Sequence, residues 1–168
     1  MTALEVKKSD AIAAVDGNTE DLIRHGFVYD EKTFSLSVEA QGNWQGIWQA
    51  FQMNIMAKIA QNQKALYDAA VLVPGYDALE DPDVDDLVAA SAALAWPIEI
   101  STKDDQAYSL AFENVNGFII SGLSWVNACI ASGRPLKVAI AAAADIGAVN
   151  AVVDTRDVAT IQAILNPP

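Results

Sequence analysis

The sequence predicts an α+β fold in which two β-hairpins form a small antiparallel sheet packed by several α-helices, one of them long. A plan of strand, tight turn, strand and helix occurs twice, starting at residues 27 and 98. Each copy has an aromatic-Ser-Leu step before its helix, Phe34-Ser35-Leu36 and Tyr108-Ser109-Leu110. Elsewhere the chain is rich in alanine, and apolar residues recur at three- and four-residue spacing, which indicates helices.

The first helix is predicted over residues 3–24, where apolar residues follow one stripe. Gly17-Asn18 interrupts the stripe and could divide it into two short helices, the second capped by Asn18 or Thr19. Gly26 is expected to end the helix, because glycine readily adopts the backbone conformation of a C-cap.

The first hairpin is predicted to join strands 27–29 and 32–34 through a turn at Asp30-Glu31. Ser35 or Ser37 should cap the next helix, which runs from residue 38 to about residue 72. A helix of this length would approach ~50 Å at about 1.5 Å per residue. That exceeds what a small domain needs for its own core, so its distal part should project or pack against a neighbour.

The second half begins with a predicted loop over residues 74–83, rich in Pro, Gly and Asp. Asp83 can cap a short helix that extends through residue 95. The second hairpin should pair strands 98–101 and 107–110.

A helix over residues 112–130 is apolar nearly all round, which is typical of a central core helix or an interface helix. We expect it to end at Gly133, and Arg134-Pro135 to open a new helix. Asp145 should cap a further short helix, and Asp154 or Thr155 the last one, at 155–165.

Composition excludes some classes of function. The chain has 168 residues, of which 52% are hydrophobic, so one domain with a sizeable core is expected. Its net charge of −12 and scattered basic residues disfavour nucleic acid and anionic membranes as partners.

The apolar run 118–130 contains Ser121, Ser124 and Asn127 and is judged too short and too polar to span a bilayer. Residues 2–10 lack the apolar core of a signal peptide, so synthesis in the cytoplasm is expected.

Few residues are candidates for chemistry. The single cysteine, Cys129, excludes an internal disulfide and lies in an apolar run, so we expect a buried small hydrophobe and not a reactive thiol. The single histidine, His25, could be a general base or a ligand, but a partner for the helix C-terminus or a surface residue is the better interpretation.

The acidic run at residues 80–86 could be a calcium-binding loop. An EF-hand loop that starts at Asp81 would need Gly at its sixth position and Glu at its twelfth, where this chain has Asp86 and Ala92. We therefore predict a solvated acidic loop, with a cation site of another type as the alternative.

Two pairs of tryptophans, Trp44 with Trp48 and Trp96 with Trp125, could be carbohydrate platforms, but Trp44 and Trp48 have the spacing of a helix core. The sequence contains no phosphate-binding Gly-rich loop, nucleophile elbow or zinc-protease motif. We therefore assign no catalytic, cofactor-binding or metal-binding residue, and we expect no cofactor.

At GFVYDEKTFSLSVEAQGNW the chain resembles a small family of uncharacterised, tail-fibre-associated proteins encoded among the structural genes of tailed bacteriophages and prophages. The resemblance covers residues 16–51 and 96–156, including WPIEISTKDDQAYSL and ACIASGRPLKVAIAAAADIGAVNAVVDTR. Glu31 stands where the family usually has a turn glycine. Residues 52–95 look like a helical and loop insertion in a single domain of residues 1–168.

The resemblance implies a non-enzymatic virion protein of the tail, fibre, baseplate or head decoration, found in the virion after synthesis in the host cytoplasm. The alternatives are a tail-fibre or tail assembly chaperone absent from the mature particle, and an enzyme that acts on cell-surface glycan through paired carboxylates. The expected partners are further copies of the chain and other virion proteins. Self-association is expected because apolar stripes at Ile55, Ile59 and Leu66 and on helix 112–130 exceed one core.

Overall fold

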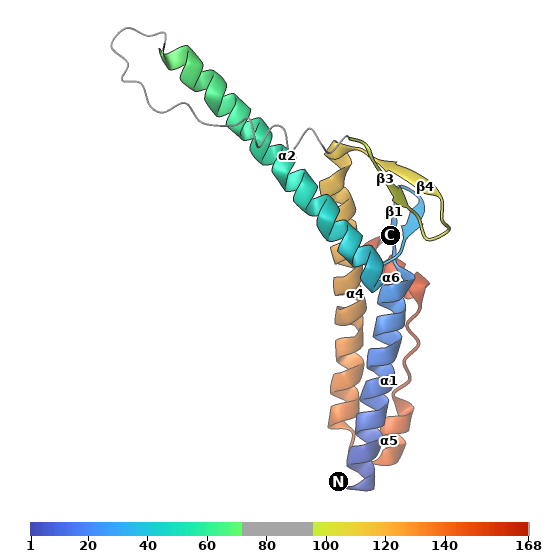
Figure 1. Cartoon of the computed structure of the whole chain (residues 1–168). Coiled ribbons are helices and arrows are strands. Elements are labelled where there is room, and N and C mark those ends of the chain that lie inside the picture. The colour runs from blue at the N-terminus through green and yellow to red at the C-terminus, as the bar shows by residue number, and fades with distance from the viewer. Residues whose placement is uncertain (72–95, 168) are drawn as a thin grey trace. The chain divides into compact units, whose positions relative to one another are not determined.

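The computed structural model describes residues 1–71 and 96–167, and Figure 1 shows its elements in chain order. The α+β class is confirmed. The expectation of one sheet is wrong in detail, because the hairpins form two separate two-stranded sheets.

The helices are α1 (Ala3–His25), α2 (Val38–Val71), α4 (Val115–Ala142), α5 (Ile146–Ala151) and α6 (Val158–Leu165), with a 3-10 turn, η1, at Phe112–Asn114. The strands are β1 (Phe27–Tyr29), β2 (Lys32–Phe34), β3 (Ile98–Ser101) and β4 (Ala107–Leu110).

The chain divides into two compact units. Unit 1 comprises residues 1–40, 101–106 and 117–168, and unit 2 comprises residues 41–100 and 107–116. Unit 1 therefore contains α1, the β1–β2 hairpin, most of α4 and the C-terminal helices. The single domain with an insertion at 52–95 stays a prediction.

Helix α1 is continuous through Gly17-Asn18, so the predicted interruption there is wrong. Thr2 and Glu5 begin it as a reciprocal capping box. Asn18 and Thr19 use their side chains for other contacts: Asn18 Nδ2 donates to the carbonyl of Arg156, and Thr19 Oγ1 to that of Val15. Gly26 ends the helix as predicted, with a φ of 90°.

The β1–β2 hairpin has the predicted strands and turn. Phe27 pairs with Phe34 and Tyr29 with Lys32, which leaves Asp30 and Glu31 as a two-residue turn. Both turn residues have positive φ, 48° and 61°, as in the type I′ turns that match the twist of a hairpin. The amide of Lys103, in the loop after β3, donates to the carbonyl of Thr33 at 2.8 Å and joins that loop to the free edge of β2.

An aromatic cluster forms the core of unit 1 beside this hairpin. The ring centroids of Phe27 and Phe34 lie 5.2 Å and 4.9 Å from that of Phe118 on α4, and all three side chains are buried. Trp125, seven residues or two turns further along α4, is buried, and its indole Nε1 donates to the carbonyl of Leu22 at 3.0 Å. Both contacts hold α4 against α1 and β1–β2.

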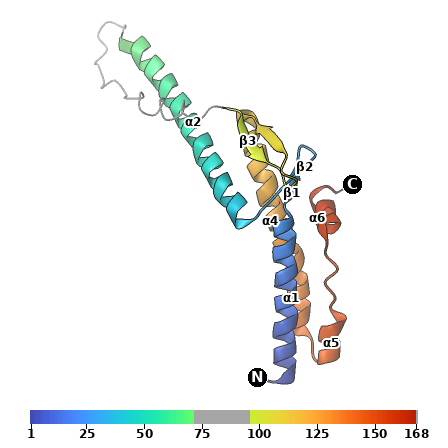
Figure 2. The ribbon, with the colours of Figure 1, turned by 45° about the vertical axis from the view of Figure 1, so that its right-hand side comes forward.

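Helix α4 continues from Val115 to Ala142, so the break predicted at Gly133 and Arg134-Pro135 is wrong. Proline within a helix loses one backbone hydrogen bond. Beyond Pro135, however, α4 buries Ile140 against Val15 and Val149 in a second apolar cluster. We infer that this burial compensates for the lost hydrogen bond. Figures 1 and 2 show α1 and α4 side by side, with the α5–α6 segment along them.

The C-terminal helices confirm one predicted cap and correct another. Asp145 caps α5 and accepts from the amide of Ala148 at 2.8 Å. Helix α6 begins at Val158, not at residue 155, and Asp157 caps it through the amide of Thr160. Asp154 cannot serve as the cap because the side chain of Arg156 binds its carboxylate.

Unit 2 contains most of the predicted long helix α2, which extends from Val38 to Val71 as expected. The amide of Ala40 binds Ser37 Oγ at 3.2 Å, so Ser37 is the cap. The core of unit 2 is an aromatic cluster. The ring centroid of Phe112 lies 4.9 Å from that of Phe51 and 5.4 Å from that of Trp96. The predicted loop 74–83, the short helix to residue 95 and the acidic run at Asp81–Asp86 lie outside the described residues.

Candidate protein-interaction surface

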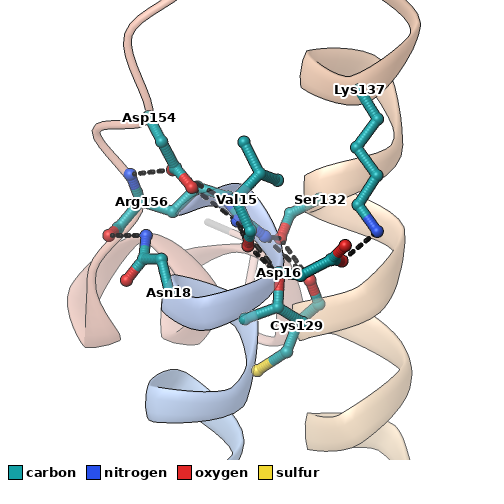
Figure 3. Close-up of polar contacts among 9 residues, drawn as sticks. Val15, Asp16, Asn18, Cys129, Ser132, Lys137, Asp154 and Arg156 are labelled. Atoms are coloured by element: carbon teal, nitrogen blue, oxygen red, sulfur yellow. Dashed lines mark hydrogen bonds and ion pairs between the residues drawn. The ribbon is translucent and has the colours of Figure 1, made fainter. Parts of the chain in front are cut away.

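A polar cluster in unit 1 surrounds Arg156 and is shown in Figure 3. The guanidinium is buried and donates to the carbonyl oxygens of Cys129 and Val15 at 3.0 Å and 3.1 Å. It also donates to Asp154 Oδ2 at 2.6 Å and to Thr19 Oγ1 at 3.1 Å. Arg156 therefore ties α1, α4 and the segment before α6 together, and its donors are occupied by the protein itself.

Asp154 balances the charge of Arg156. Hydrogen bonds from the Arg156 side chain are the main reason that the pKa of the Asp154 carboxyl falls from 3.8 to about 2. Nothing in the local sequence singles out this pair, although both residues lie in the stretch VVDTR that carries the resemblance. The other partners of Arg156 lie 24 or more residues away in sequence, so a local pattern could not identify them.

Cys129 and His25 have the positions predicted from the sequence, Cys129 in an apolar helix and His25 at a helix C-terminus. Cys129 is fully buried, as expected, and burial raises the pKa of its thiol to about 11, so the nucleophilic thiolate is scarce at neutral pH. His25 is the last residue of α1, and its carbonyl accepts from Lys103 Nζ at 2.9 Å. Its Nδ1 is enclosed and has no hydrogen-bond partner among the described residues.

The tryptophans do not form one carbohydrate platform. Trp125 is buried in the core of unit 1, which removes it from any surface. Trp48 is half-buried and stacks on Phe51, and Trp44 is half-buried as well, so the predicted core role of these two is met only in part. Trp96 contacts Phe112 edge to face inside unit 2.

Two shallow grooves lie in unit 1 among the described residues. One, of about 460 Å³, lies between α1 and α5 over the apolar cluster of Val15, Ile140 and Val149. The other, of about 240 Å³, lies between β1, α4 and α6. The one carboxylate that lines either groove is Asp154, which is bound to Arg156, so neither groove presents the pair of carboxylates that a glycosidase uses. In the described part of the chain, no cluster of His, Cys, Asp or Glu could hold a metal ion.

The outer face of α4 has a different character. At 100° per residue, seven of its exposed positions fall on an arc of about 100°, opposite the buried Phe118, Trp125 and Cys129. Ile120, Leu123, Ile130 and Val138 are 52%, 60%, 41% and 68% exposed. Asn127, Ala131 and Arg134 lie on the same arc and are also exposed. We call these seven residues the α4 face.

The α4 face is both apolar and free of negative charge. Helix α4 contains no Asp or Glu, whereas the whole chain has a net charge of −12. From Ile120 to Val138 a helix is ~27 Å long and ~10 Å wide, so the α4 face offers roughly 300 Å². At about 25 cal/mol per Å² of apolar surface, leaving it in water costs up to ~7 kcal/mol. The largest apolar patch on a typical monomer has an area of about 300–600 Å² and is often functional.

The same helix is longer than expected from the sequence. With η1 it extends over Phe112–Ala142, and by length and composition it could cross a membrane. The run 118–130 that was judged too short to span a bilayer is one part of this longer helix, and the expectation that the protein has no membrane partner stays a prediction. One such helix is weak evidence for a membrane, since core helices of soluble proteins pass the same test, and Trp125 and Cys129 on α4 are buried by protein.

Comparison of the chain with protein-family models, with curated proteins and with solved structures gave no match. The resemblance to phage structural-module proteins thus stays a prediction from the sequence.

Proposed function

We propose that this chain is a non-enzymatic structural protein of a tailed bacteriophage particle, and that it acts through protein–protein contacts made by the α4 face. One observation carries the contact role: an apolar face without acidic side chains on a chain of charge −12. Such a face gains free energy when another protein covers it. The resemblance of residues 16–51 and 96–156 supports the phage assignment.

The polar groups of unit 1 also favour a structural role. The buried Arg156–Asp154 pair is satisfied by backbone carbonyls and hydroxyls of α1 and α4. The thiol of Cys129 is buried and protonated at neutral pH. These groups hold the helices of unit 1 together, because they interact with other groups inside the protein.

A protein inventory of purified particles tests this function. Particles produced by the host that carries the gene are banded by density and quantified by mass spectrometry against their major structural proteins. We expect the chain in a fixed ratio to those proteins. A chain that is abundant in the lysate but absent from the particles would instead indicate the assembly chaperone.

A matched pair of variants connects the α4 face to incorporation. Leu123→Asp places a charge on the α4 face, whereas Val153→Asp places the same charge on a similarly exposed apolar residue elsewhere, 64% against 60% exposed. We expect the Leu123 variant to be lost from particles and the Val153 variant to be retained. Equal incorporation of both would contradict the contact role of α4.

A further inference from the structure

We propose that the free edge of β1 is a docking site for an extended peptide segment of another protein, which adds to the β1–β2 hairpin as an antiparallel third strand. This is a second contact surface, beyond the α4 face of the proposed function.

The register of the hairpin determines which main-chain groups β1 presents. Tyr29 and Lys32 flank the two-residue turn and form a hydrogen-bonded pair, and such pairs alternate along an antiparallel ladder with pairs that are not hydrogen-bonded. Val28 and Thr33 form the next pair, so their N–H and C=O groups point away from the opposite strand. At Val28, β1 therefore offers one donor and one acceptor to a further strand.

The two edges of the hairpin differ in what meets them. On the β2 edge, the outward carbonyl of Thr33 accepts a hydrogen bond from the amide of Lys103 at 2.8 Å. On the β1 edge, the N–H and C=O of Val28 have no hydrogen-bond partner among the described residues, and the residue is 46% exposed. An open edge of this kind is the surface to which extended peptides add as strands.

The side chains of β1 indicate where those of the added strand would lie. The ring centroids of Phe27 and Tyr29 lie 5.2 Å and 5.5 Å from that of Phe118, so this face of β1 points towards α4. Residues that are opposite each other in paired strands direct their side chains to the same face. The residue of the added strand opposite Phe27 therefore faces α4 and the groove of about 240 Å³ that Phe27 lines.

The lining of this groove determines the chemistry of the occupant. Ile120 is apolar, and the hydroxyl of Ser124 and the amide of Gln162 have no hydrogen-bond partner among the described residues. None of the described residues that line the groove is charged. At the far end of β1, the turn residues Asp30 and Glu31 are acidic and exposed. A complementary segment is therefore apolar where it faces the groove and basic beside the turn.

A pair of five-residue peptides tests the edge. In acetyl-Lys-Val-Thr-Ile-Thr-amide, antiparallel to β1, the central Thr lies opposite Val28, the Lys opposite Asp30 and the Ile opposite Phe27. An analogue that is N-methylated on the central Thr has the same side chains but cannot donate to the carbonyl of Val28. Each peptide is titrated to about 5 mM into isotope-labelled protein and followed by NMR, since we expect a Kd of about 1 mM.

We expect the unmethylated peptide to shift the amide signal of Val28 and to slow its hydrogen exchange at least threefold, whereas the N-methylated peptide does neither. Equal effects of the two peptides, or no shift at Val28 at about 5 mM peptide, would overturn the proposal. A Val28 shift that grows with protein concentration in the absence of peptide would show that a second copy occupies the edge, and would overturn it as well.

A matched pair of proline variants tests the same edge from the protein side. Val28→Pro removes the outward N–H of β1, and Thr33→Pro removes the outward N–H of β2, at positions where an edge strand tolerates proline. With binding followed at the Ser124 amide, Val28→Pro should bind the peptide at least ten times more weakly than the wild type, and Thr33→Pro about equally well. Equal weakening in both folded variants would contradict docking on β1. These outcomes do not depend on whether the chain is found in particles.

Discussion

Gly133 lies directly against the guanidinium of Arg156. A methyl group on Gly133 would be 2.7 Å from Arg156 Nη1 and 3.2 Å from Thr19 Oγ1, closer than such atoms normally approach. The guanidinium cannot withdraw easily, because it is bonded to carbonyls of both α1 and α4. A glycine that reads as a helix end in the sequence is therefore a close-approach site within a continuous helix.

Gly133→Ala should destabilise the protein by about 2 kcal/mol, because the overlap with Arg156 outweighs the ~1 kcal/mol that alanine gains over glycine in a helix. The matched control is Gly17→Ala, in the middle of α1, where a methyl group meets no atom within 4 Å. The control should gain about 0.5–1 kcal/mol. Urea unfolding followed by circular dichroism measures both, and a stabilising Gly133→Ala would refute the packing described for Arg156.

The Asp154–Arg156 pair should make stability depend on pH in the acid range. The pKa of Asp154 is lowered from 3.8 to about 2 in the folded protein, so its contribution is fully present above pH ~4. The contribution is lost as the pH falls through about 2. Its size is about 2 kcal/mol, at 1.36 kcal/mol for each pKa unit.

Comparison of the wild-type protein with Asp154→Asn isolates this contribution. At pH 7 the variant should be less stable by roughly 3 kcal/mol, because a buried guanidinium loses its charged partner. The gap should narrow by about 2 kcal/mol between pH 4.5 and pH 2. A gap that stays constant over this range would show that the Asp154 carboxyl is not ionised in the way described.

The β1–β2 turn carries strain that a substitution can relieve. Glu31 has a φ of 61°, a left-handed conformation that costs a residue with a Cβ about 1 kcal/mol and costs glycine nothing. Glu31→Gly should therefore raise the free energy of unfolding by about 1 kcal/mol. Lys32→Gly, one residue later within β2, is the control and should lower it by about 0.5–1 kcal/mol. A shift of the same sign in both variants would show that turn geometry is not the cause.

Local patterns predicted the elements well. The strands 98–101 and 107–110, the turn at Asp30-Glu31 and the caps at Gly26 and Asp145 follow from residue types within a few positions, and the structure has them all. The errors at Gly17-Asn18, Gly133 and Asp154 all involve Arg156. The Asn18 side chain binds the carbonyl of Arg156 and caps no second helix, Gly133 lies against the Arg156 guanidinium, and the same guanidinium binds the carboxylate of Asp154.

The candidate surface was only partly predictable. An apolar character nearly all round indicated that helix 112–130 is a core or interface helix, and the structure divides it into a buried side at Trp125 and Cys129 and an exposed side at Leu123 and Ile130. The sequence could not say which side is which, because that depends on where α1 and Arg156 pack.

Quantification of the chain in purified particles tests the role of the α4 face most directly. Particles assembled with wild-type protein, with Leu123→Asp or with the equally charged control Val153→Asp are compared by mass spectrometry. We predict the same ratio to the major structural proteins for the wild type and the control, and a ratio lower by about tenfold or more for Leu123→Asp, with the same circular dichroism spectrum in all three purified proteins. A wild-type protein that is absent from the particles, or a Leu123→Asp variant that is incorporated like the control, would contradict a structural role through α4.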